Sequence, residues 1–206
     1  MATNLLAPNG LSFDSNRRAS APTYQGNRYF IKAGYATAIG KGDLVKTGTG
    51  TYQGYIIPSA LTDTIALGVF AAVLPYYDLT IQGTGHGLNG AWPTNANPQS
   101  DVGVLIYDDP DAEFIAQVSG GPWLQSWRGQ NINFLTGTNG APNSAGTSTL
   151  ALDATTIGTS NTLPFRIVDY AYGPGDTPGF NAPPVNVNPW IRVKLNNSEN
   201  NAPTGV

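Results

Sequence analysis

The chain has 206 residues, with 10 Lys and Arg against 13 Asp and Glu, a net charge of -3, and no cysteine. Nucleic-acid binding needs dense positive charge, so this balance argues against it, and the lack of cysteine excludes disulfides and thiolate metal sites. Only 11% of residues are charged, while 25 are Gly and 16 are Pro. This composition disfavours helices and predicts an all-β fold, a small barrel or sandwich of short antiparallel strands with long Gly/Pro/Asn-rich loops.

The N-terminal sequence and the hydropathy of the chain indicate where the protein is made and whether it enters a membrane. The first ten residues have neither the basic start nor the apolar stretch of a secretory signal, and no segment has the length of a membrane span. We therefore expect synthesis in the cytoplasm and no membrane partner. The low charge is then consistent with large contacts to partner proteins, since interface cores are depleted in charged residues.

Residues 1–27 show neither the period of a strand nor that of a helix. We interpret them as an extended N-terminal arm that lies on a neighbouring subunit, because a solvated tail would have no use for its large apolar side chains. The alternative is a loosely ordered terminus. The candidate partner-binding residues of this arm are Leu5, Leu6, Leu11, Phe13, Arg17 and Arg18.

Residues 28–195 are predicted to form a β-rich domain, followed by a polar tail over 196–206. Short apolar runs between turn signals predict strands over 28–32, 39–46, 51–57, 66–73, 132–135, 148–152, 163–170 and 189–195. Gly68 indicates a bulge or a close backbone approach inside one of them. Long loops are expected at 78–100 and 136–162, and Trp92 in the first of these is a further candidate for partner binding.

The segment 101–118, DVGVLIYDDPDAEFIAQV, predicts a hairpin at the centre of the fold. Two β-branched and aromatic runs flank an Asp-Asp-Pro-Asp turn, in which Pro presets the backbone and Asp bonds it locally. Both strands are apolar on both faces, which indicates that they are covered on two sides.

Three patterns that carry chemistry in other proteins have simpler explanations here. Asp108, Asp109, Asp111 and Glu113 could hold Ca²⁺, but Asp is also the residue that such a turn requires. The only histidine, His86, has no nucleophile motif nearby. Residues 85–90 match G-x-G-x-x-G, yet the Ala-Trp-Pro that follows does not open a helix. We therefore predict no enzyme activity, with no catalytic, cofactor-binding or metal-ligating residues.

Three segments carry a family resemblance: VGVLIYDDPDAEFIAQV, LPFRIVDY and NPWIRVKLNNSE. They resemble small structural proteins of tailed-bacteriophage virions, most of all the capsid decoration (cement or minor head) proteins. The resemblance implies a protein without catalytic residues or cofactors that binds the outer surface of the capsid and stabilises it by bridging subunits of the major capsid protein. Self-association as a trimer or dimer follows from the symmetry of capsid junctions.

Several alternatives remain open. The chain could be a tail, collar or fibre-attachment component of the same virion, which would also be β-rich. It could be a carbohydrate-binding β module that uses some of its four Trp residues, or a hydrolase with dispersed carboxylates. For the decoration protein, we expect the arm to reach a capsid or sister subunit, where Arg17 and Arg18 pair with acidic groups.

Overall fold

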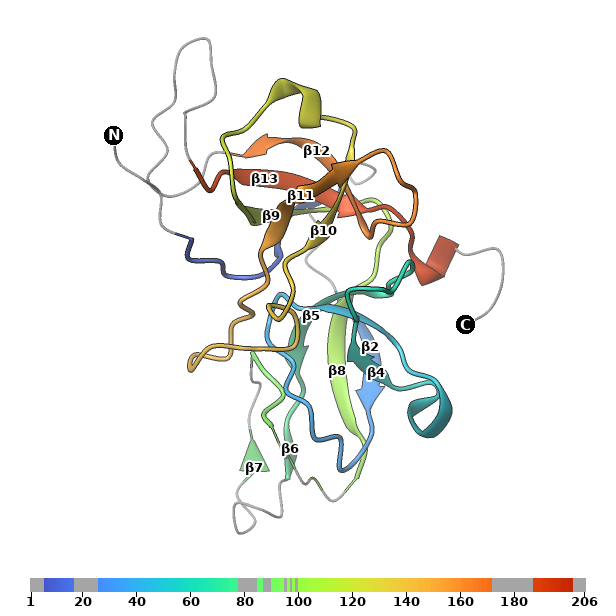
Figure 1. Ribbon diagram of the computed structural model, residues 1–206. Coiled ribbons are helices and arrows are strands. Elements are labelled where there is room, and N and C mark those ends of the chain that lie inside the picture. The colour runs from blue at the N-terminus through green and yellow to red at the C-terminus, as the bar shows by residue number, and fades with distance from the viewer. Residues whose placement is uncertain are drawn as a thin grey trace.

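A computed structural model describes residues 6–16, 26–77, 85–86, 90–94, 96, 98, 100–171 and 187–201. This part of the chain is all-β, as the composition predicted. Five of its strands close into a barrel, five others form an antiparallel sheet, and no α-helix is present among the described residues. The barrel and the sheet lie one above the other, each with its own apolar core (Figure 1).

The barrel contains one parallel strand pair in an otherwise antiparallel ring. Its strands are β9 (Ala112–Ser119), β10 (Asn131–Phe134), β11 (Leu152–Gly158), β12 (Phe165–Ala171) and β13 (Trp190–Leu195). They follow the order β9-β11-β10-β12-β13, and β13 pairs back to β9, which closes the ring. The parallel pair is β9 with β11. The inward side chains of β9 are Phe114, Ala116 and Val118, all without exposed surface.

The sheet has the order β2-β8-β5-β3-β4 and is antiparallel throughout. Its strands are β2 (Asn27–Ile31), β3 (Leu44–Thr47), β4 (Ile56–Pro58), β5 (Gly68–Val73) and β8 (Val102–Tyr107). A short ladder of β6 (Tyr76–Tyr77) and β7 (Gly85–His86) extends from it. Most predicted strands are confirmed, but the strand expected over 51–57 begins only at Ile56. The residues before it include the turn η1 (Gly50–Tyr52).

The prediction of a central hairpin is wrong: both strands form, but they do not pair with each other. β8 belongs to the sheet and β9 to the barrel, so the Asp-Asp-Pro-Asp turn carries the chain from one to the other. The physical reason is that β2 and β5 already occupy both edges of β8. The turn itself has the predicted chemistry, because Asp109 Oδ1 accepts a hydrogen bond of 2.8 Å from the backbone N–H of Asp111.

The N-terminal segment contains a strand that the sequence did not indicate. β1 (Ser12–Asn16) pairs with the first half of β9, along the same edge that β11 uses further on. Phe13 packs against Phe114, with ring centroids 6.0 Å apart, and against Tyr107 at 5.1 Å. The chain therefore forms β1 on the barrel, builds the whole sheet, and returns to complete the barrel.

Two further expectations within the strands can be compared with the structure. A Cβ atom at Gly68 would lie 2.3 Å from the backbone oxygen of Tyr107, so the predicted close approach is confirmed. The strand expected over 148–152 begins only at Leu152, because Ser148 is bonded across to the sheet instead. Trp123, before the turn η2 (Gln125–Trp127), and Trp127, its last residue, pack edge to face in the barrel core.

Candidate functional site

Backbone hydrogen bonds join the barrel to the sheet at three places. Leu11 N–H donates to Gly42 O over 2.9 Å, and Ser148 N–H donates to Lys41 O over 2.9 Å. At the third place, Ala66 N–H donates to Asn197 O over 3.2 Å. The contacts come from the N-terminal segment, the β10–β11 loop and the chain after β13. The two parts are thus tied together by segments far apart in sequence.

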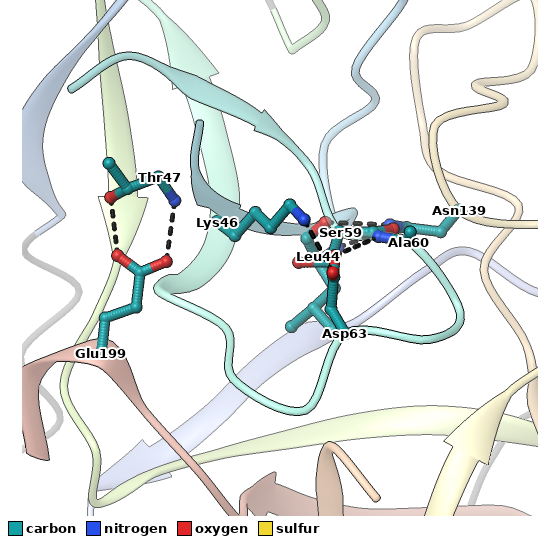
Figure 2. A network of polar contacts seen from close by, with 8 residues as sticks. All are labelled: Leu44, Lys46, Thr47, Ser59, Ala60, Asp63, Asn139 and Glu199. Atoms are coloured by element: carbon teal, nitrogen blue, oxygen red, sulfur yellow. Dashed lines mark hydrogen bonds and ion pairs between the residues drawn. The ribbon is translucent and has the colours of Figure 1, made fainter. Parts of the chain in front are cut away.

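One asparagine of the β10–β11 loop reinforces this junction (Figure 2). Asn139 Oδ1 accepts the N–H of Leu44 over 2.8 Å, while its Nδ2 donates to Leu44 O over 2.9 Å and to Ser59 O over 2.8 Å. The side chain thereby binds β3 on both sides of one residue, as a neighbouring strand would. Asparagine suits this position because its amide carries both an acceptor and two donors.

Carboxylates bind the sheet next to this junction. Glu199, in the turn η3 (Glu199–Asn201), accepts from the N–H of Thr47 over 2.8 Å and from its Oγ1 over 2.6 Å (Figure 2). Lys46 forms an ion pair of 2.7 Å with Asp63, which also accepts the N–H of Ala60. The described part of the polar tail is therefore bonded to the sheet.

Two buried carboxylates have the same structural use. Asp43 has no exposed surface and accepts from Gly40 N–H over 2.6 Å and from the Ser148 hydroxyl. Burial raises the pKa of the Asp43 carboxyl above its ordinary range, against the effect of these bonds.

Asp108, the first residue of the acidic turn, accepts from Asn27 Nδ2 over 2.8 Å and from Tyr29 Oη over 2.6 Å. Asn200 Nδ2 donates to the same carboxylate over 3.1 Å. Burial, together with the bond to Asp108, raises the pKa of Tyr29 above its ordinary value. The acidic turn thus joins the start of β2 to the C-terminal segment, and within the described residues no cluster of metal-ligating side chains is found.

Of the four sequence-predicted partner residues that the structure describes, three lie in the chain's own packing. Trp92 has no exposed surface, and its Nε1–H donates to Tyr35 O over 2.9 Å, so it is a core residue of the sheet rather than a partner contact. Leu11 is buried in the barrel core, and Phe13 packs against that core. The sequence did not indicate that Trp92 is buried, because it stands in a polar segment and the residues that it packs against are distant in the chain. Leu5, Arg17 and Arg18 lie outside the described residues.

Of the described candidates, only Leu6 is exposed. It lies where hydrogen bonds join the N-terminal segment, β9 and the residues before β13. Gln117 on the outer face of β9 accepts the N–H of Ala7 over 2.8 Å and donates to Asn188 O over 3.2 Å. Asn188 in turn accepts the N–H of Gly120 over 3.3 Å. The side chains of Leu6 and Val187, next to these bonds, are 41% and 47% exposed.

We call Leu6 and Val187 the Gln117 surface. Leu124, which is 52% exposed, lies in the loop after β9, four residues beyond Gly120 in the sequence. Nothing in the sequence around Val187 or Leu124 marked them as surface residues, since both lie in proline- and glycine-flanked loops where periodicity is absent.

A separate pocket of about 380 Å³ lies at the junction. It is lined by Thr64, Ile65, Asn161, Thr162, Asn196, Asn197, Ser198 and Asn201. Asn197 Nδ2 donates to Thr64 O over 3.0 Å and to Asn161 O over 2.6 Å, so its amide holds the pocket walls together. The lining lacks the aromatic platform on which sugars usually stack, and the pocket gives no support to carbohydrate binding.

The comparisons with known proteins add no relative. No protein-family model matches the chain, no curated protein matches it, and no solved structure matches it. In the part of the chain that the structure describes, no helix is long and apolar enough to cross a membrane.

Proposed function

We propose that this is a non-enzymatic structural protein of a tailed-phage virion, which decorates the outer surface of the capsid and stabilises it by bridging subunits of the major capsid protein. The observation that carries the proposal is the Gln117 surface. There, Leu6 and Val187, each next in sequence to a residue hydrogen-bonded to Gln117, have large exposed fractions. Exposed apolar side chains grouped within a polar rim are typical of a protein contact.

The way the chain uses its polar side chains supports the same proposal. Asp43, Asp108 and Glu199 accept backbone or side-chain hydrogen bonds that join distant segments. Hydrogen bonds of this kind hold the barrel and the sheet together as one unit. Such a body stabilises an assembled lattice by mass action when it binds that lattice better than the free subunits.

The N-terminal arm enters this proposal in a narrower form than the sequence suggested. Residues 12–16 form β1 of the chain's own barrel, so a deletion of 1–27 would remove a strand as well as a contact. Leu6 is the described arm residue that remains available to a partner. Its replacement tests the contact without removing β1.

Co-sedimentation with purified heads of the encoding phage tests the proposal. The wild-type chain should bind saturably, and the double variant Leu6→Asp with Val187→Asp should lower occupancy at least about tenfold, because it places two charges in an apolar contact. Leu61→Asp is the matched control, since Leu61 is 38% exposed but lies away from Gln117 in the loop after β4.

The proposal fails if the wild-type chain stays in the supernatant with heads from which the native protein has been stripped. Binding that is unchanged in the double variant would instead move the contact to another face. Labelled chain found on tails or collars in electron micrographs, and absent from heads, would favour the other virion position.

A further inference from the structure

A basic groove of about 470 Å³ lies on the outer face of the barrel, away from the Gln117 surface in sequence. Its lining residues are Arg128, Gly129, Arg166, Ile167, Val168, Asp169 and Lys194. The groove thus holds three of the chain's ten Lys and Arg residues and one carboxylate. Its local charge of about +2 contrasts with the net charge of -3 of the whole chain.

Among the described residues that line the groove, positive charges outnumber negative ones. Arg166 on β12 and Lys194 on β13 face each other directly in the antiparallel register. Like charges placed directly opposite on neighbouring strands destabilise a sheet. Within the described residues, no ion pair is formed by either side chain: Asp169 is paired with Arg128, and Glu113, opposite Lys194 on β9, is paired with Arg192.

The backbone shapes the groove around these two cations. The β12–β13 register shifts between Ile167 and Asp169, which marks a bulge at Val168. Bulges re-aim side chains and are common beside binding sites. Gly129 lies beside the Arg166 guanidinium, since a Cβ atom placed there would be in ordinary contact with Arg166 Nη2 at 3.9 Å.

The number and kind of these charges favour carboxylates over a nucleic acid. A phosphate backbone requires many cations along its length, and the acidic chain around this short groove would repel it. A guanidinium presents a planar fork that matches a carboxylate, and a lysine beside it offers a second point charge. Two neighbouring carboxylates on one protein segment fit the pair.

We propose that the groove binds an acidic segment of a protein partner, with carboxylates facing Arg166 and Lys194. The identity of that partner as a capsid subunit rests on the proposed function. The groove and the Gln117 surface are then two contacts of one decorating chain, one charged and one apolar. Binding through the groove weakens as salt is raised, because both cations are at least partly exposed.

The test has two arms that use the full-length chain. In the first, a labelled hexaglutamate peptide is titrated by fluorescence anisotropy against wild type, against Arg166→Gln with Lys194→Gln, and against Lys41→Gln. Lys41 is exposed in the connection between β2 and β3, so its variant shows the effect of removing one positive charge outside the groove. We expect the double variant to bind at least about tenfold more weakly, and Lys41→Gln to bind as wild type.

The second arm measures sedimentation of the same variants with purified phage heads. Equal peptide binding by wild type and the double variant overturns the groove, as does tighter binding of a single-stranded oligonucleotide than of the peptide. Peptide binding that depends on the groove while no variant sediments with heads supports the groove and contradicts the proposed function. Sedimentation that does not depend on the groove, without peptide binding, contradicts the groove alone.

Discussion

Replacing Asn139 with Asp tests the junction between barrel and sheet. The carboxylate keeps the acceptor for Leu44 N–H but places oxygen against Leu44 O and Ser59 O, where the amide donated two hydrogen bonds. Two lost bonds cost about 1 kcal/mol each, and the opposed oxygens add a similar amount, so the free energy of unfolding should fall by roughly 3 kcal/mol. For a chain of this size, that corresponds to a Tm lower by roughly 6–12 °C.

Thermal and urea unfolding monitored by Trp fluorescence measure this change, and pH separates its cause. The repelled carboxylate has a higher pKa in the folded than in the unfolded state. The destabilisation is therefore complete above the folded-state pKa, shrinks as pH falls through that pKa, and is smallest below about pH 4, where Asp is protonated in both states and can donate again.

Asn143→Asp is the matched control. The Asn143 side chain uses its Oδ1 to accept from Ala145 N–H and Thr147 N–H, and a carboxylate can accept both hydrogen bonds. It should leave the Tm within about 2 °C of wild type. A loss at position 139 no larger than this control, or one that does not depend on pH, would refute the reasoning.

Three further changes test the core and one surface carboxylate. Trp92→Ala should lower the free energy of unfolding in urea by about 3–5 kcal/mol, since the side chain is fully buried. A change within experimental error would contradict the burial of Trp92. Gly68→Ala should cost roughly 3 kcal/mol or more because its Cβ meets a backbone oxygen at 2.3 Å, whereas Gly158→Ala, with nothing closer than 3.9 Å, should be tolerated; equal melting curves would contradict the close approach. The hydrogen bond from Ala33 N–H is the main cause that lowers the pKa of Asp101, so the stability it contributes is present above about pH 4 and lost as pH falls through the folded-state pKa. The difference in Tm between wild type and Asp101→Asn should therefore shrink in acid, and a constant difference would exclude this carboxylate as the source.

The sequence predicted the individual strands well because their signals are local. Apolar runs such as 163–170 and 189–195 become β12 and β13. The partner of each strand was not local information. The Asp-Asp-Pro-Asp turn has the same chemistry whether the chain pairs with itself or crosses to another sheet, and only the occupied edges of β8 decide between them.

The candidate site was largely beyond reach of the sequence for the same reason. β1 has the sequence Ser-Phe-Asp-Ser-Asn, which carries no strand period, and it forms because one edge of β9 is open to it. Gln117 binds Ala7 and Asn188, the sequence neighbours of Leu6 and Val187, and it is distant from both in the chain. The basic groove likewise depends on the register of β12 with β13, which no local pattern encodes.

The position of the chain on the virus particle tests the central proposal most directly. Quantitative mass spectrometry of purified particles, combined with electron cryomicroscopy of the heads, would measure its copy number and its place. The account predicts many copies on the outer capsid surface, bridging neighbouring subunits of the major capsid protein through the Gln117 surface. Particles that lack the chain, or that carry it only in the tail, would contradict the account.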